Sequence, residues 1–352
     1  MKKVLAVLMA TISVLTLAAW NAAAAPATDR IHFMNTGNSD AILLESDGHF
    51  ALVDAGEDTD NPRGFADLEL EGFEQRVLAY LKANAADENG KVYLDFVLGT
   101  HSHSDHIGGF DTILSDPDVS VGRAYLKRYD SSKISRYEID NWDNQEVYDQ
   151  MMAALQARNI PVISDMDDTP FMLGNFKVTL FNTDDPQTDE RVGENDQSLG
   201  VLLEKNGTRV FLAGDMDDYT GDETRLAPLI GKVDLLKVGH HGNEGSSTEG
   251  FIRTLSPRIC VFTAYRKPYN EKTRRSFARI CHPEVYFTTE ENGVLAAVGD
   301  NGAITCSGQL HPDAGTQTAA QKISHFFVAC GRGFVRAFNL ILLKLTALFR
   351  RG

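Results

Sequence analysis

The segment THSHSDHIGG, residues 100–109, places four side chains that commonly bind metals within six positions: His101, His103, Asp105 and His106. The run just before it, VYLDFVL, has the β-branched and aromatic residues of a buried strand. We therefore expect the cluster on the loop that follows a strand. Neighbouring side chains alternate faces along a strand but can converge from a loop. We expect the HxH pair to hold one ion and the following Asp-His pair to hold another.

Imidazole and carboxylate groups are ligands that suit zinc and related first-row metals. A carboxylate also supplies the charge that helps to hold a second ion nearby. We therefore predict two divalent cations as cofactors, Zn²⁺ in the first place and Mn²⁺ as the alternative. A merely polar surface loop is disfavoured, because the ligand-type residues alternate with serine and are followed by Gly-Gly.

Further ligands are expected at the ends of two later apolar runs. Asp215 follows the run at 209–213, and we expect its carboxylate to bridge both ions. His240 follows the run at 233–238 in the sequence GHHG, where it could complete the shell of the second ion. His241 then acts on the substrate or serves as the alternative ligand.

Segments with strand-like and helix-like patterns alternate from residue 31 to residue 308, and no Pro/Gly/Ser linker divides them. The second half repeats the plan of the first. This alternation predicts an α/β fold, an αββα sandwich of two mixed β-sheets flanked by helices. The domain is expected over residues 26–308, with a polar linker over 309–330 and a separate helix over 331–352.

Residues 1–25 have the features of a secretory signal peptide. They begin Met-Lys-Lys, continue with an apolar run over 4–17 and end in four alanines. This predicts an exported protein, either secreted or associated with the cell envelope. A retained membrane anchor is the alternative, although the run is short for a helix that spans a bilayer.

Residues 334–351 form a predicted basic amphipathic helix. Its apolar residues share one helical face, and its basic residues lie on the other. We expect this helix to contact an anionic membrane surface, with docking on the protein's own core as the alternative. Asn339 and Lys344 interrupt the apolar run and disfavour a spanning helix.

The formal net charge is −15, which would repel a polyanion at long range. Nucleic acid is therefore disfavoured as a partner unless metals and a local basic patch compensate. Export would permit disulfides, but four cysteines in 352 residues form no disulfide framework. The pairing of these four stays open: Cys260, Cys281, Cys306 and Cys330.

Taken together, several motifs resemble the metallo-β-lactamase superfamily. They are VDAG with Asp54, the HxHxDH cluster, GD with Asp215 and GHHG with His240, in that order along the chain. The resemblance covers about residues 31–300. It implies an αββα sandwich whose loops meet along one edge around one or two metals, usually zinc. Asp54 is expected to orient a ligand from outside the metal shell.

Two branches of that superfamily are especially similar. The segments NDQSL at 195–199 and KVGHHG at 237–242 resemble the hydrolase domain of competence DNA-uptake channels. The segments at 37–58, 124–135 and 228–237 resemble the catalytic domain of teichoic-acid phosphorylcholine esterase. The second resemblance implies a phosphodiester that carries choline as the substrate.

The sequence departs from many relatives at one place, because no histidine occurs between His106 and His240. The nearest position of the motif is Asn195. The resemblance implies that Asn195 contributes to the first ion's shell, and its alternative role is that of a turn residue before a strand.

The expected reaction is hydrolysis of a phosphodiester by a metal-bound hydroxide. Asp105 and His241 are the predicted catalytic residues. The substrate would be a phosphorylcholine-type or other cell-envelope phosphodiester. Tyr125, Tyr129 and Trp142 are expected to contact a quaternary ammonium through their aromatic faces.

Three other functions stay open at this stage. One is an extracellular nuclease like the DNA-uptake domain, and another is a hydrolase of the β-lactamase or lactonase type. The last is a metal-binding envelope protein that has no catalytic activity.

Overall fold

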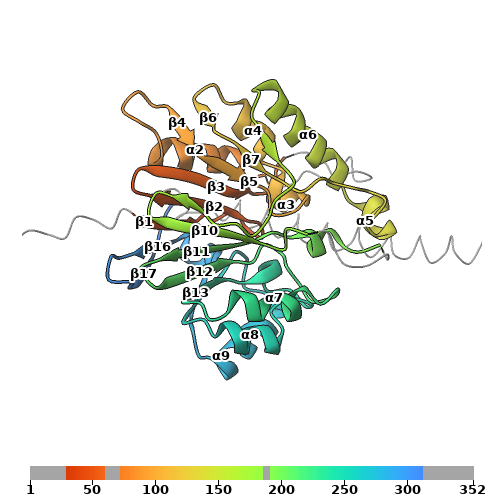
Figure 1. Ribbon diagram of the computed structural model, residues 1–352, viewed down its shortest axis with the longest axis vertical. Coiled ribbons are helices and arrows are strands. Elements are labelled where there is room, and N and C mark those ends of the chain that lie inside the picture. Colours follow the sequence, from red (N-terminus) through yellow and green to blue (C-terminus); the bar gives the residue numbers. More distant parts are fainter. Residues whose placement is uncertain (1–28, 60–71, 185–190, 312–352) are drawn as a thin grey trace, which may run out of the picture. The chain divides into compact units, whose positions relative to one another are not determined.

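The computed structural model describes residues 29–59, 72–184 and 191–311, and these residues build two β-sheets that pack between two layers of helices (Figure 1). The eight-stranded sheet has the order β17(Ile304–Gly308), β16(Val294–Val298), β1(Asp29–Phe33), β2(Ala41–Ser46), β3(His49–Ala55), β5(Phe96–Leu98), β7(Ala124–Tyr125), β8(Val162–Ile163). The seven-stranded sheet has the order β15(Glu284–Phe287), β14(Ile259–Phe262), β13(Leu235–Lys237), β12(Thr208–Leu212), β11(Gly200–Lys205), β10(Phe176–Phe181), β9(Phe171–Leu173).

Both sheets are mixed, as the sequence predicted. In the larger sheet β1, β2 and β3 pair antiparallel, whereas β3, β5, β7 and β8 pair parallel. In the smaller sheet β9 to β12 pair antiparallel and β12 to β15 pair parallel. Two further strands, β4(Val92–Leu94) and β6(Val119–Val121), form a parallel pair of their own.

Helices cover the outer face of each sheet (Figure 1). The first group comprises α2(Glu74–Asn84), α3(Ser104–Ile107), α4(Phe110–Ser115), α5(Arg136–Asn141) and α6(Asn144–Ala157). The second group comprises α7(Asp222–Ile230), α8(Glu249–Leu255), α9(Pro268–Ile280) and α10(Thr288–Glu291). Two short 3₁₀ helices, η1(Glu194–Gln197) and η2(Gly239–Gly242), are formed by the segments ENDQ and GHHG.

Three apolar layers account for this arrangement. Side chains from both sheets, such as Phe33 and Leu203, meet in the central layer. Residues such as Leu81 of α2 and Met151 of α6 pack on the larger sheet. Phe251 of α8 and others pack on the smaller sheet. Because each sheet buries both faces, the predicted αββα sandwich is confirmed.

The run VYLDFVL was predicted as one strand, and the structure corrects this. Asp95 divides the run into β4 and β5, which belong to different sheets. Its backbone N–H donates to the carbonyl of Phe50 over 2.7 Å, and its carboxylate accepts a hydrogen bond from the N–H of Phe50. A charged residue that bonds to the neighbouring strand thus ends one strand and begins the next.

The predicted signal peptide, residues 1–25, and the predicted helix at 331–352 lie outside the described residues, as does most of the linker. Within the described ranges no helix is long and apolar enough to cross a membrane. Three of the cysteines are described, Cys260, Cys281 and Cys306, and each is a free thiol.

Candidate metal centre

Four loops that follow neighbouring strands bring the candidate ligands together. Strand β5 leads into the HxHxDH segment, and β3 beside it carries Asp54 near its end. In the other sheet β12 leads to Asp215 and β13 leads to the GHHG segment. Parallel neighbours end at the same edge of a sheet, so each pair of loops emerges together. The site therefore lies where these strand ends of the two sheets meet.

Four of these side chains form one compact group, in which Asp105 is partly buried and the other three are buried: Asp105, His106, Asp215 and His241. Their ligand-type atoms all lie within 4.8 Å of one another. Nε2 of His106 is 3.1 Å from Oδ1 of Asp215. Nε2 of His241 is 3.2 Å from Oδ2 of Asp105 and 3.4 Å from Oδ2 of Asp215. The chain thus gathers two imidazoles and two carboxylates at one point.

The polar atoms at the centre of this group fit a metal ion. Nε2 of His106, Nε2 of His241 and Oδ1 of Asp215 are buried and make no well-aligned hydrogen bond. Buried polar atoms are normally satisfied, so unsatisfied atoms that converge call for another partner. Two nitrogen and two oxygen ligands suit zinc or a related divalent ion.

His106 is held in the orientation that such a site requires. Its Nδ1 donates to Oδ2 of Asp54 over 2.8 Å, which directs Nε2 toward the centre of the group. Asp54 is itself fixed by the backbone N–H and the hydroxyl of Thr100, each at 2.8 Å. The backbone of Asp54 has φ of +57°, an uncommon conformation that aims the carboxylate at the loop.

His101 and His103 face each other beside this group. Nε2 of His101 lies 3.0 Å from Nδ1 of His103. The other ring nitrogens have separate partners, because Nδ1 of His101 contacts Ser198 Oγ at 3.2 Å and Nε2 of His103 contacts Glu138 Oε2 at 3.3 Å. The two facing nitrogens are therefore close enough to contact one ion together.

The structure distinguishes the two histidines of GHHG. His241 is buried and belongs to the compact group, and its Nδ1 lies 3.0 Å from the carbonyl of Thr263. The side chain of His240 is 25% exposed, and its Nε2 is 3.9 Å from Oδ2 of Asp215. Both residues have left-handed backbone conformations, with φ of +47° and +52°. These consecutive strained residues send the two rings in different directions.

Asn195, in η1, lies next to His240. Its Nδ2 is 3.2 Å from Nδ1 of His240, while its Oδ1 is buried without a hydrogen-bond partner. The Nδ2 atom thus contacts a histidine, while the Oδ1 atom is left available as an acceptor, as in a weak metal ligand. The geometry brings Asn195 to the site.

Sequence reasoning missed a buried ion pair beneath the site. The ammonium of Lys237 pairs with Asp40, donates to the carbonyl of Gly214 over 2.8 Å and lies 3.6 Å from Oδ1 of Asp215. Asp40 also lies 3.5 Å from Nδ1 of His241. Lys237 and Asp40 are charged residues inside or beside apolar strand runs, and this pattern could have revealed them. Glu138, the partner of His103, carried no such signal.

The pKa values of His106 and His241 reflect the carboxylates that surround them. Burial alone would lower the pKa of His106, but the carboxylates of Asp215 and Asp54 raise it well above its usual range. Burial likewise opposes protonation of His241, yet Asp215 and Asp105 raise its pKa to about 10. Protons on these imidazoles balance the carboxylates, and binding of a divalent ion would have to displace them.

Aromatic residues predicted to contact the substrate have different surroundings. Trp142 is 37% exposed, and the centroid of its ring lies 4.6 Å from that of the His103 ring. Tyr125 is buried in the central layer against Phe171, so the structure does not bring it to the site. Tyr129 is half-buried and packs near Tyr148, with ring centroids 6.0 Å apart.

A family model, described as "Beta-lactamase superfamily domain", matches residues 50–241 of this chain. Those residues include Asp54, the HxHxDH cluster, Asp215 and both histidines of GHHG. The match thus covers the elements that carry the candidate metal centre.

Known proteins with similar sequences include ComE operon protein 3 of Bacillus subtilis (strain 168), 26% identical over 211 residues. The alignment covers 57% of this chain and 24% of that protein. Recombination protein 2 of Haemophilus influenzae is 24% identical over 241 residues, which is 68% of this chain and 24% of that protein. The chain therefore spans about a quarter of the length of these relatives.

Among solved structures, the metallo-beta-lactamase fold protein YhfI from Bacillus subtilis aligns with a TM-score of 0.45 at 14% sequence identity. The alignment covers 74% of this chain and 96% of that one.

Proposed function

The chain belongs to the metallo-β-lactamase superfamily, and from that premise we propose that it is a metal-dependent phosphodiesterase. The observation that carries the proposal is the convergence of Asp105 with the buried side chains of His106, Asp215 and His241. Buried atoms of His106, Asp215 and His241 are left without hydrogen bonds, although Asp54 fixes the other side of the His106 ring. Such preorganisation suits a metallohydrolase centre better than a merely structural polar cluster.

We assign one ion to the compact group of four residues. His101 and His103 would hold a second ion, with Asn195 as a further ligand and Asp215 shared between the two. Divalent ions held in this way supply a water of lowered pKa and stabilise charge on phosphoryl oxygens. These assignments make His241 a metal ligand, which was the alternative to His240 in the prediction from the sequence.

The chain's own residues then have distinct tasks. Asp54 fixes His106 and Glu138 fixes His103, so both rings keep their ligand nitrogens directed inward. The pKa of Asp105 is about 2 because the His106 and His241 charges outweigh burial, which would raise it. Asp105 therefore stays ionised at neutral pH and serves as a carboxylate ligand rather than as an acid.

We assign proton transfer to His240. Burial lowers its pKa, which leaves the ring neutral near pH 7, and it is the more exposed histidine of GHHG. In the hydrolysis, a bond forms between the water oxygen and phosphorus while the ester bond to the leaving oxygen breaks. Nε2 of His240 would take up the proton of the water and return it to the leaving oxygen.

The substrate that we favour is a phosphorylcholine-type or related cell-envelope phosphodiester. Trp142 lies beside His103, and the ring of Tyr137, a residue that is 66% exposed, lies 6.5 Å from the ring of Trp142. Exposed aromatic faces attract a quaternary ammonium, and Glu138 adds negative charge nearby. Such a substrate agrees with the proposed export of the protein and with contact between residues 334–351 and a membrane surface.

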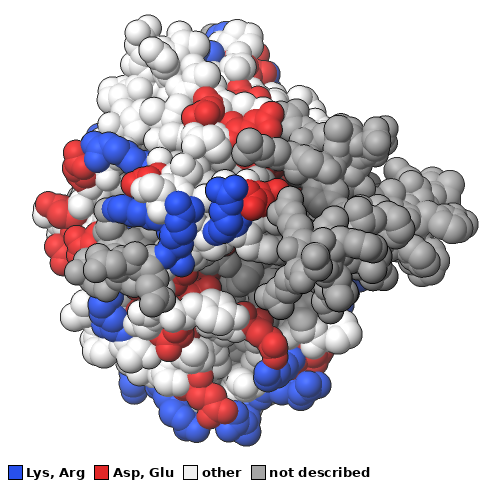
Figure 2. Space-filling view, turned by 90° about the vertical axis from the view of Figure 1, so that its right-hand side faces the viewer, with Lys and Arg blue, Asp and Glu red and all other residues white. Residues whose placement is uncertain are grey.

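A nuclease is the second candidate, supported by relatives whose names refer to recombination and to the ComE operon. The distribution of charged side chains on the surface argues against a nuclease. Among the residues that the structure describes, Figure 2 shows acidic and basic side chains intermixed over the face that it presents, without one continuous basic band. A groove that follows a nucleic-acid backbone would be expected to carry such a band.

The test compares substrates with one preparation of the full chain. Metal-free protein is reloaded with Zn²⁺ or Mn²⁺ and assayed on p-nitrophenyl phosphorylcholine, bis(p-nitrophenyl) phosphate, single-stranded DNA and a chromogenic β-lactam. We expect both nitrophenyl phosphodiesters to be cleaved, the choline ester faster, and the activity to disappear with a chelator. Cleavage of DNA alone would support the nuclease, and cleavage of the lactam alone would overturn the phosphodiesterase.

A further inference from the structure

Lys237 lies beneath the candidate metal centre and is completely buried. Its ammonium pairs with Asp40, donates to the carbonyl of Gly214 over 2.8 Å and lies 3.6 Å from Oδ1 of Asp215. Charges are costly to bury, and a buried ion pair is often no more stabilising than apolar residues of similar volume. The stability of the fold alone therefore does not explain why a lysine occupies the last position of β13.

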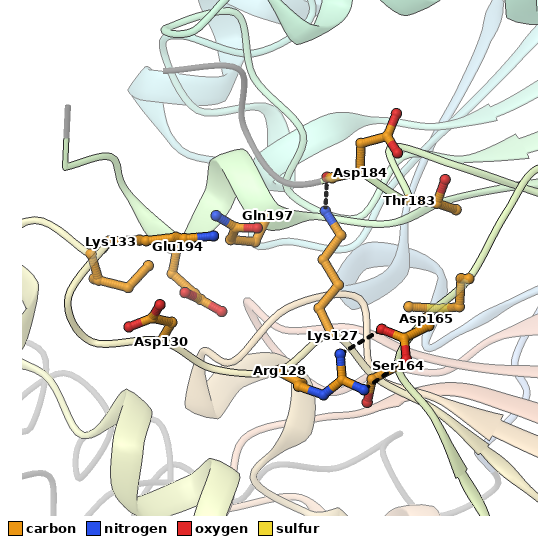
Figure 3. A pocket seen from close by; sticks show the side chains of 12 residues that line it. Lys127, Arg128, Asp130, Lys133, Ser164, Asp165, Thr183, Asp184, Glu194 and Gln197 are labelled. Atoms are coloured by element: carbon orange, nitrogen blue, oxygen red, sulfur yellow. Dashed lines mark hydrogen bonds and ion pairs between the residues drawn. The ribbon is translucent and has the colours of Figure 1, made fainter. Parts of the chain in front are cut away.

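Two other described lysines are buried, Lys127 and Lys205, and their surroundings differ from those of Lys237. Figure 3 shows Lys127 at the wall of a cavity of about 430 Å³, where its ammonium donates to a backbone carbonyl over 2.8 Å. Lys205 pairs with Asp29 between the two sheets. Lys237 instead faces Asp215, so its charge acts directly on a proposed metal ligand.

Asp40 extends the contacts of this ion pair to two further ligands. Its Oδ1 accepts a hydrogen bond from the hydroxyl of Thr263 and lies 3.5 Å from Nδ1 of His241. Its Oδ2 lies 3.8 Å from Nδ1 of His106. Together with the contact to Asp215, the pair of Lys237 and Asp40 therefore approaches three of the four members of the compact group.

Lys237 also supplies a cation to a second group of ligand-type atoms. Asp40, Asp54 and His106 place such atoms within 4.8 Å of one another. The ammonium of Lys237 pairs with Asp40, and Nδ1 of His106 bonds to Asp54. The chain thus neutralises this group with its own side chains, and the compact group of four is left as the place for a metal.

We propose that Lys237 is a positioning residue of the metal centre. Asp40 anchors its ammonium, which holds the Asp215 carboxylate with Oδ1 3.1 Å from Nε2 of His106 and Oδ2 3.4 Å from Nε2 of His241. Each oxygen of the shared carboxylate is thereby directed to a different part of the centre before a metal binds. This role rests on the proposed function for the identity of the metal ligands and not for the reaction.

The test exchanges both partners of the ion pair at once, in Lys237→Met/Asp40→Asn. This double variant has the same net charge as the wild type, so it separates positioning from the attraction of a cation by charge. The matched control, Lys205→Met/Asp29→Asn, makes the same exchange in the other buried pair. Replacing a whole buried pair is often close to neutral for stability, so we expect both variants to fold, and urea unfolding checks this.

Zinc affinity is measured on the full chain by competition with a chromogenic chelator. We expect Lys237→Met/Asp40→Asn to bind Zn²⁺ about 10- to 100-fold more weakly than the wild type, and the control to stay within about twofold. The visible absorption spectrum of the Co²⁺-loaded chain depends on the arrangement of the ligands. It should change in the first variant and not in the control.

Unchanged zinc affinity in Lys237→Met/Asp40→Asn would make the pair purely structural and overturn the proposal. The single variant Lys237→Met adds a second test, because loss of a positive charge alone would strengthen the binding of a cation. Tighter binding in that variant, with wild-type binding in the double variant, would also overturn it. If the double variant does not fold, Asp40→Asn keeps the lysine and weakens its anchor, and unchanged affinity there would contradict the proposal.

The two proposals can fail separately. If the wild-type chain binds zinc, the double variant binds it more weakly and neither cleaves a phosphodiester, the proposed function is wrong and the role of Lys237 is supported. If the wild type cleaves phosphodiesters and the double variant keeps its zinc affinity, the phosphodiesterase stands and the role of Lys237 is wrong. Absence of zinc binding by the wild type would overturn both.

Discussion

His106 donates a hydrogen bond through Nδ1 to Oδ2 of Asp54 over 2.8 Å, and both side chains are completely buried. The bond fixes the ring so that Nε2 faces Asp215. A residue that never touches the ion thereby determines how well one of its ligands is placed.

Replacing Asp54 by Asn should weaken metal binding while the fold is retained. The amide has nearly the same shape, but it cannot hold His106 as a charged acceptor can. We expect an affinity for Zn²⁺ that is lower by about 10- to 100-fold, measured by competition with a chromogenic chelator. Asp47→Asn, in an exposed turn, is the control. Unchanged affinity in Asp54→Asn would show that this hydrogen bond does not tune the site.

The two histidines of GHHG should respond differently to alanine. His241→Ala removes a proposed ligand, so the protein should lose metal and all turnover. His240→Ala should retain its metal and lose most of its turnover, because only proton transfer is affected. Elemental analysis combined with kinetics separates the two cases. The reverse pattern would exchange the roles assigned to these residues.

Asp29 should stabilise the fold in a pH-dependent way. Its buried carboxylate on β1 pairs with Lys205 on β11 and so joins the two sheets. Burial would raise its pKa, but hydrogen bonds from Lys205, Ser46 and Asn175 lower it below 3.8. A carboxylate with a lowered pKa stabilises above the unfolded-state pKa, and this contribution disappears as the pH falls through the folded-state value.

We expect Asp29→Asn to lower the free energy of unfolding at pH 7 by about 3 kcal/mol. The difference from wild type should shrink below pH 3.8, because wild-type Asp29 is then progressively protonated. Urea unfolding at several pH values measures this. The control is Asp165→Asn, which breaks an exposed pair with Arg128 and should cost less than about 1 kcal/mol. Equal costs in the two variants would contradict the role of Asp29.

Metal removal should destabilise the folded chain. A ligand that binds only the folded state stabilises it by about 2.7 kcal/mol when present at 100 times its Kd. We therefore expect Zn²⁺ to raise the Tm of the metal-free protein and a chelator to reverse this. Asp215→Ala should abolish most of the shift. A shift of full size in that variant would place the bound zinc elsewhere.

Much of the fold could be predicted because the apolar pattern was clear where strands are buried. The apolar run at 209–213 overlaps β12, and the run at 233–238 contains β13. The apolar pattern gives little sign of helix α9, because Phe277 is the one apolar residue among its three buried residues, Asn270, Thr273 and Phe277. Asp95 split a predicted strand through a hydrogen bond to Phe50, a contact that depends on the tertiary structure.

The candidate ligands could be found from the sequence because they cluster in short motifs. The choice between His240 and His241 could not, since adjacent residues share one motif and only their backbone angles separate the two rings. Glu138 is far from HxH along the chain and meets His103 only through folding. Tyr125 carried no signal that distinguishes a core aromatic from one that contacts substrate.

The central claim is that hydrolysis of a phosphodiester depends on ions held at this site. The most direct test adds Zn²⁺ in steps to the metal-free full chain and follows bound metal and cleavage of bis(p-nitrophenyl) phosphate in the same samples. We predict that turnover rises with bound metal until the site is filled, and that Asp215→Ala shows no turnover at any step. Full turnover by the metal-free chain, or none by the fully loaded chain on any phosphodiester, would contradict the account.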